Sequence, residues 1–117
     1  MKTLATLLTT LAITVSLNAH SATSTSTTTT VTSMYTYAGL SDLENDIIVK
    51  VTTPVTGCEG GFWVKSTDNL ANQNISSFLL SAFHNGSKVY FGAYIDQTWS
   101  ASASPKYCRV HSIGVEK

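Results

Sequence analysis

The chain has 117 residues, with seven Lys or Arg and seven Asp or Glu, so its formal net charge is zero. A chain of this length is expected to form a single domain. Because the basic residues do not outnumber the acidic ones, no basic face is implied and nucleic acid is not expected as a partner.

Residues 1–22 have the order of regions found in a secretory signal peptide. Lys2 precedes an uncharged run from Thr3 to Leu17, which small residues follow. The run is shorter than the roughly 20 apolar residues of a spanning helix. We expect cleavage after Ala19 or Ala22 and export to the periplasm or the medium. Since no second run of that length follows, stable membrane anchoring is not expected after the signal is removed.

The next residues, 23–30, are rich in Ser and Thr and offer nothing to bury. They are predicted to form a flexible leader before a single domain over residues 31–117. That domain begins with side chains that alternate with a period of two over residues 31–37, which predicts a strand. A second strand with the same alternation is predicted over residues 46–53.

Two cysteines, Cys58 and Cys108, are predicted to form a disulfide, because an exported chain meets an oxidising compartment. A redox thiol or a metal site fits less well, since there is no C-x-x-C motif. Cys58 precedes a third predicted strand, residues 61–66, whose entry contains Gly60 and Gly61. These glycines permit a bulge or a sharp bend. Because they lead into a strand and not a helix, no phosphate-binding loop and no cofactor is predicted.

One helix is predicted after the third strand. Asn72 or Asn74 is expected to cap its start, and Asn85-Gly86 supplies a left-handed stop. Its polar face carries no Lys or Arg, which favours a core helix packed on a sheet over a membrane-surface helix. The apolar residues have the 0, 3, 4, 7, 8 spacing of a single stripe: Ile75, Phe78, Leu79, Ala82 and Phe83.

Two further strands are predicted over residues 87–96 and 107–115. In the last strand the apolar phase changes after Val110, which predicts a bulge near Ser112. The order β-β-β-α-β-β, with its helix between strands three and four, is that of a small five-stranded OB-like barrel. An open α+β sheet with one covering helix is the alternative fold.

The chain resembles a known family in several motifs: GC-x-x-GFWV around Cys58, a helix ending LLSAFHNG, the strand KVYFGAYID, and W-x-x-S-x-x-x-x-x-C-R-V-x-x-I-G-V near the C-terminus. These motifs resemble those of small exported proteins of Gram-negative bacteria without assigned function. They are similar, more remotely, to the receptor-binding B subunits of subtilase-cytotoxin-type AB5 toxins. The resemblance covers about residues 31–115, and the cysteines and Trp99 are its most specific points. The resemblance implies an OB-like barrel that binds glycans as a homo-oligomer, namely a pentamer. It assigns no glycan-binding residue.

No combination of nucleophile, base and orienting group is apparent in the sequence. His84 is expected to interact with the helix dipole at the C-terminal end, and His111 is expected to be solvated. We therefore predict a non-enzymatic module that binds a protein or a glycan, with no catalytic residue and no metal. A toxin B-subunit-like component and an envelope structural or stress protein are the alternatives.

Trp99 is the most informative candidate for partner binding, because it lies in a loop of small residues where no strand pattern requires a large aromatic side chain. Either it packs against the disulfide or one end of the barrel, or it stacks on a ligand such as a sugar. In the second case Tyr94 and Tyr90, on the preceding strand, extend the same surface.

Overall fold

The computed structural model describes residues 21–26, 28–39, 41–66 and 69–117. The predicted signal peptide, residues 1–22, lies outside these ranges apart from its last two positions. Within the described ranges the protein is mainly β, with six strands, one α-helix and one short 3-10 helix. In chain order the elements are β1 (Thr23–Thr25), β2 (Thr29–Thr36), η1 (Ser41–Leu43), β3 (Ile47–Val51), β4 (Gly61–Val64), α1 (Leu70–Asn85), β5 (Lys88–Thr98) and β6 (Tyr107–Glu116).

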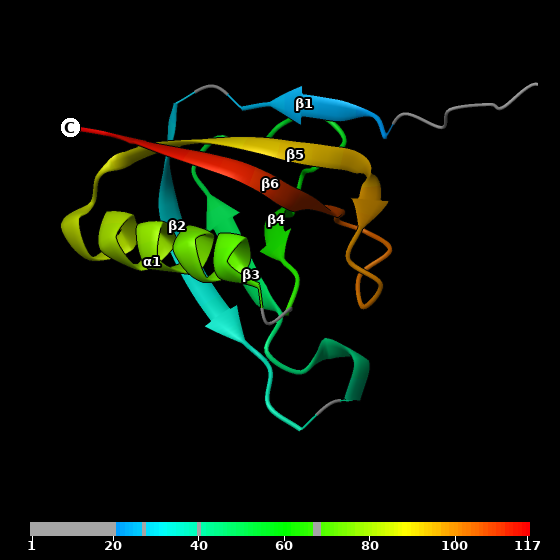
Figure 1. Cartoon of the computed structure of the whole chain (residues 1–117). Helices are drawn as coiled ribbons and strands as arrows, with labels where there is room; N and C mark the ends of the chain where they lie inside the picture. The colour runs from blue at the N-terminus through cyan, green and yellow to red at the C-terminus, as the bar shows by residue number, and fades with distance from the viewer. Residues whose placement is uncertain (1–20, 27, 40, 67–68) are drawn as a thin grey trace, which may run out of the picture.

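The strands form one ring-like sheet. β2 pairs with β3, β3 with β4, β4 with β6, β6 with β5, and β5 again with β2. Neighbours are antiparallel except for β4 and β6, which run parallel. β5 and β6 lie side by side along most of their length (Figure 1). The contact of β5 with β2 is short, and consists of the pairs Thr29↔Val89 and Thr30↔Lys88.

The mainly β fold and the place of the helix in the chain are confirmed. From β2 to β6 the order is strand, strand, strand, helix, strand, strand, as predicted. Because the β5–β2 contact is short, we describe the sheet as ring-like and not as a barrel. A ring-like sheet with α1 packed over it fits the alternative of an open α+β sheet with one covering helix (Figure 1).

β1 lies where a flexible leader was expected. Its residues pair with residues 92–94 of β5. Next to it, the hydroxyl of Ser26 accepts a hydrogen bond from the backbone N–H of Phe91 at 2.7 Å, and the Ser26 N–H donates to the Phe91 carbonyl at 2.8 Å. An edge strand gains stability from such ladder bonds without burying apolar side chains, which is why composition alone misses it. Thr29 and Thr30, also assigned to the leader, belong to β2.

A bulge in β6 lies where the sequence predicted one. Gly92 of β5 pairs with Ser112, whereas Ala93 pairs with Val110. His111 is thus the extra residue on the β6 side, and His111 and Ser112 together oppose Gly92. Such bulges turn side chains out of the regular alternation, and here the bulge places two consecutive side chains near one glycine.

α1 starts earlier than predicted. Asn69 is its N-cap, and the Asn69 side chain accepts a hydrogen bond from the Asn72 N–H at 2.8 Å. The expectation that Asn72 or Asn74 caps the helix is therefore wrong, because both lie inside it. The C-terminal stop is confirmed: Gly86 follows the last helical residue with φ 64°, in the left-handed region.

The buried stripe of α1 is narrower than predicted. Ile75, Leu79 and Ala82 are buried against the sheet. Phe78 and Phe83, which were expected in the same stripe, are 53% and 45% exposed. The spacing 0, 4, 7 of the buried residues describes one narrow line of contact, so the two phenylalanines lie on its flanks.

The inner core lies between α1 and the sheet. The rings of Phe62 and Phe91 stack at its centre with centroids 4.3 Å apart. Other fully or nearly fully buried members come from β3 to β6: Val49, Val64, Val89, Ala93, Val110 and the two cysteines.

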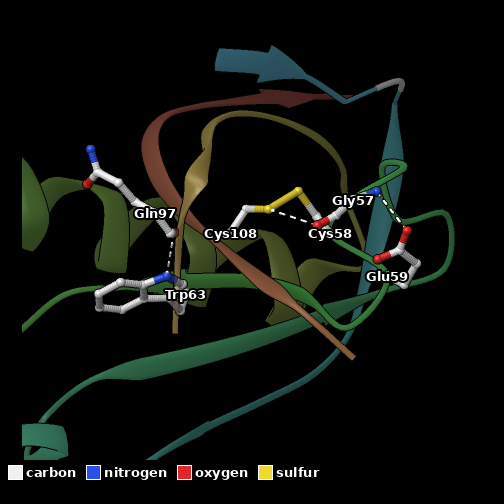
Figure 2. The surroundings of a disulfide bond; sticks show 6 residues. All are labelled: Gly57, Cys58, Glu59, Trp63, Gln97 and Cys108. Carbon is white, nitrogen blue, oxygen red and sulfur yellow. Dashed lines mark hydrogen bonds between the residues drawn. A yellow bond between two sulfur atoms is a disulfide. The ribbon is translucent and has the colours of Figure 1, made fainter. Parts of the chain in front are cut away.

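The predicted disulfide is present. Cys58 and Cys108 are bonded, both are fully buried, and their Cα atoms are 5.4 Å apart (Figure 2). Cys108 lies opposite Phe62 in the parallel pair of β4 and β6, so the bridge fixes the entry of β4 to β6. Next to it, the Glu59 carboxylate accepts a hydrogen bond from the Gly57 N–H at 2.7 Å. This bond lowers the pKa of Glu59.

Candidate functional site

The residues predicted to bind a partner separate into two places. Trp99 is only 4% exposed. It belongs to an aromatic cluster on the outer side of the sheet, where its ring lies 5.3 Å from Tyr37 and 6.0 Å from Tyr107. Ile48 and Trp63 complete the buried part of this outer cluster.

Polar contacts fix Trp99 in the outer cluster. Its indole N–H donates to the buried carboxylate of Asp46 at 3.1 Å, and its backbone N–H donates to the Tyr107 carbonyl at 2.9 Å. Trp99 was a candidate surface residue for partner binding, and the structure corrects this: Trp99 is a buried packing residue. The indole packs against Tyr37 and Tyr107 and bonds to Asp46, and strand alternation cannot reveal such long-range contacts.

The end of β5, just before the loop to β6, is bonded to a second aromatic residue. The indole N–H of Trp63 donates to the Gln97 carbonyl at 3.2 Å (Figure 2). Trp63 lies in β4, opposite Ile48 of β3 and Arg109 of β6. Trp63 is 8% exposed and Trp99 is 4% exposed, so neither indole offers a ligand an accessible ring face.

Tyr90 and Tyr94 lie on the outer face of β5. They alternate with Val89, Phe91 and Ala93, which are buried in the inner core. Tyr90 is 41% exposed, and Tyr94 is half-buried. These two predicted residues therefore share one accessible face of the β5–β6 pair, as expected.

Glycines create the space in which the aromatic rings lie. Gly114 of β6 pairs with Tyr90, and a Cβ at Gly114 would overlap the tyrosine ring. A Cβ at Gly92 would likewise overlap the Ser112 hydroxyl and crowd the His111 ring. The side chains thus lie close over the sheet backbone, and aromatic cover of glycine is a known way to stabilise a sheet.

His111 lies near both tyrosines and its ring contacts that of Tyr94. Its ring centroid lies 4.8 Å from that of Tyr94, and its Cε1 lies over Gly92, between Tyr90 and Tyr94 along β5. We call Tyr90, His111 and Tyr94 the aromatic strip. Because of the β6 bulge, His111 and Ser112 together oppose Gly92 on this face.

Hydrogen-bonding groups lie beside the aromatic strip. Arg109 pairs with Tyr94 in the sheet, and its guanidinium donates to the Gln97 side-chain oxygen at 3.0 Å. Ser112 lies against Gly92. A surface of ring faces with a fixed guanidinium, an amide and a hydroxyl at its side offers both apolar contact and directional hydrogen bonds.

His111 is exposed, as expected, but reasoning from the sequence missed its ring contact with Tyr94 and its position over Gly92. The available signal was the phase change near Ser112, because a bulge predicts that one side chain is redirected. His84 is exposed in the last turn of α1, as expected for a histidine near the negative end of the helix dipole.

A second accessible aromatic residue, Tyr35, lies at the margin of the outer cluster. It is 37% exposed, its ring lies 5.8 Å from that of Tyr37, and the Lys50 ammonium lies 6.0 Å from its centroid. Partial burial, with smaller contributions from Tyr107 and Tyr37, raises the pKa of Tyr35 to about 12. Tyr35 is therefore a neutral phenol at physiological pH.

Residues 21–26, 28–39, 41–66 and 69–117 contain no group of three or more His, Cys, Asp or Glu side chains that could hold a metal ion. In the same part of the chain, no helix has the length and apolar character needed to cross a membrane.

No protein-family model, no curated protein and no solved structure matches this chain. The resemblance to small exported Gram-negative proteins and to AB5 toxin B subunits stays a prediction. The interpretation of the candidate site depends on the geometry of the aromatic strip itself.

Proposed function

We propose that the protein is an exported, non-enzymatic binding module that takes carbohydrate on the aromatic strip of Tyr90, His111 and Tyr94. The observation that carries this proposal is that three rings share one face of β5 and β6: the His111 ring lies 4.8 Å from that of Tyr94, and its Cε1 lies over Gly92, which stands between the two tyrosines in β5. Ring faces on rigid strands supply contact area at little conformational cost.

Carbohydrate suits this surface better than a large apolar partner. A pyranose ring has an apolar face of C–H groups, which packs on aromatic rings, and a rim of hydroxyls, which needs hydrogen-bond partners. Beside the strip, Arg109, Gln97 and Ser112 provide donors and acceptors. The strip is also only partly exposed, with Tyr90 at 41%, so its apolar area is too small for a broad protein interface.

Export is supported by the disulfide. A buried Cys58–Cys108 bond is consistent with an oxidising location outside the cytoplasm. The predicted signal peptide agrees with that location.

A glycan array tests the proposal, followed by titration of any glycan that binds. Tyr94→Ala and His111→Ala each remove one ring, and we expect affinity to fall by about tenfold, which corresponds to about 1.4 kcal/mol. Tyr35→Ala is the matched control, because it removes a ring of similar exposure from β2. Thermal melts of all variants separate lost binding from lost folding.

Two results contradict the proposal. The first is that no glycan on the array binds wild-type protein. The second is that Tyr94→Ala and His111→Ala bind as tightly as Tyr35→Ala. In either case the strip serves to cover Gly92 and Gly114, and the partner binds elsewhere.

A further inference from the structure

The last two residues of the predicted signal peptide are bonded to the end of β5. Ile95 donates its backbone N–H to the Ala22 carbonyl at 3.0 Å, and the Ala22 N–H donates to the Asp96 carboxylate at 3.1 Å. The side chain of Gln97 donates to the Ser21 hydroxyl at 3.2 Å. Three consecutive residues of β5 thus bond to the two residues that precede β1.

These bonds continue the pairing of β1 with β5, which lie side by side (Figure 1). Thr23 is opposite Tyr94, so in the same antiparallel register Ala22 is opposite Ile95. The bond between Ile95 and Ala22 belongs to this register. A signal peptide is discarded and has no need to match the folded domain, whereas Ser21 and Ala22 do match it. They therefore have the character of the first residues of the domain.

The two candidate cleavage sites leave different mature chains. Cleavage after Ala22 removes Ser21 and Ala22 with all of these bonds, and cleavage after Ala19 keeps them. Both sites have alanine at position −1, so position −3 distinguishes them. An A-x-A-like site takes an apolar side chain there. Leu17, at −3 of the first site, is apolar, whereas His20, at −3 of the second, is polar. Cleavage after Ala19 is favoured on both grounds.

The retained segment also borders the candidate site. Gln97, whose side-chain N–H donates to Ser21, accepts a hydrogen bond from the Arg109 guanidinium through its side-chain oxygen at 3.0 Å. Arg109 pairs with Tyr94 of the aromatic strip. The Gln97 amide is thus held between Ser21 and Arg109, next to the strip.

We propose that the signal peptide is removed between Ala19 and His20, so that Ser21 and Ala22 stay in the mature chain and lengthen the β1 edge of the sheet. The reaction is a hydrolysis by the signal peptidase of the exporting cell. Water adds across the Ala19–His20 peptide bond, which breaks to leave a carboxylate on Ala19 and a free α-amino group on His20. The proposal rests on the export included in the proposed function and is independent of the ligand.

The intact mass of protein recovered from the periplasm or medium of a bacterial host tests the cleavage site, and N-terminal sequencing confirms it. We expect a chain that starts at His20. A chain that starts at Thr23, or at another residue after Met1, overturns the proposal while export itself stands. A chain that keeps Met1 overturns the proposal and export together.

Amide hydrogen exchange tests the bonds to β5. Chains that start at His20 and at Thr23, each released from a cleavable tag, are compared by nuclear magnetic resonance. The Ile95 amide has its carbonyl partner only in the longer chain, so it should exchange at least about tenfold more slowly there. The Phe91 amide is the matched control, because its bond to the Ser26 hydroxyl is present in both chains.

We expect Phe91 to exchange at the same rate in the two chains. Equal rates for Ile95 in the two chains overturn the proposed role of Ser21 and Ala22 at the β1 edge. An increase for Phe91 as large as that for Ile95 also overturns it, because the loss is then general and does not follow the bond to Ala22.

Discussion

The indole N–H of Trp99 donates to Oδ2 of Asp46 at 3.1 Å in the interior of the protein. The other carboxylate oxygen of Asp46 accepts the backbone N–H of Ser66 at 2.9 Å. Trp99 follows β5, Asp46 precedes β3, and Ser66 lies beyond β4. One buried carboxylate thus ties together three segments that are distant in sequence.

Replacing Trp99 tests how much its hydrogen bond to Asp46 and its packing contribute to stability. Trp99→Phe keeps an aromatic ring but removes the donor, so one buried oxygen of Asp46 loses its partner; we expect a loss of about 1–3 kcal/mol in the free energy of unfolding. Trp99→Ala also removes the packing on Tyr37 and Tyr107, and should cost about 3–5 kcal/mol. Urea denaturation measures both. Glycan binding by folded Trp99→Phe should equal that of wild type, and a selective loss of binding would return Trp99 to the candidate site.

The disulfide should be a main source of stability. It closes a loop with a sequence separation of 50, and in the chain-entropy model such a loop is worth about 4 kcal/mol. We expect the Cys58→Ala/Cys108→Ala double variant to lose about this amount in urea denaturation. Wild-type protein treated with a reductant should shift similarly, and the reductant should leave the double variant unchanged. An unaltered unfolding midpoint in the double variant is the contrary result.

Two glycines with positive φ should respond differently to alanine. Gly61 has φ 120°, and a Cβ there would overlap the Val49 carbonyl oxygen of β3, a backbone atom that cannot move aside. Gly57 has φ 85°, but a Cβ there would meet nothing within 4 Å. We expect Gly57→Ala to cost about 1–3 kcal/mol through backbone strain and Gly61→Ala to prevent folding. Circular dichroism melts distinguish them, and a Gly61→Ala protein as stable as Gly57→Ala would contradict the close approach of β3 and β4.

Tyr35 makes the protein sensitive to alkaline pH. Its pKa is raised from 10.0 to about 12 in the folded protein, so folding favours the neutral phenol. The stability from this preference is fully present below pH 10, and it is lost as the pH rises from about 10 to about 12. Ultraviolet titration of wild type against Tyr35→Phe should show one late-titrating tyrosine missing from the variant. If all tyrosines of the folded protein titrate near pH 10, the expected shift is absent.

Local signals predicted the features that depend on neighbouring residues. Gly86 ends α1 because Asn85-Gly86 readily adopts a left-handed stop. The phase change after Val110 located the β6 bulge, because an extra residue shifts the alternation wherever it occurs. The pairing of Cys58 with Cys108 required only an oxidising compartment and two cysteines.

Features that depend on distant contacts were missed or misread. The sequence left Trp99 open between packing and stacking on a ligand, because nothing near it in sequence shows that Tyr37, Tyr107 and Asp46 surround it. Phe78 was assigned to the core because the helical stripe does not indicate how wide a line of contact the sheet offers. Of the aromatic strip, the two tyrosines were identified from strand alternation, whereas His111 needed the register of β6 against β5.

The place of β6 in the ring also sets the order of assembly. β6 is the last strand of the chain, yet it lies between β4 and β5 and pairs with both. As the chain emerges N-terminus first during synthesis, β4 cannot meet its parallel neighbour, and Cys58 cannot meet Cys108, until the final segment is free. Non-local pairing of this kind delays folding. The ring therefore closes only after β6 has been made.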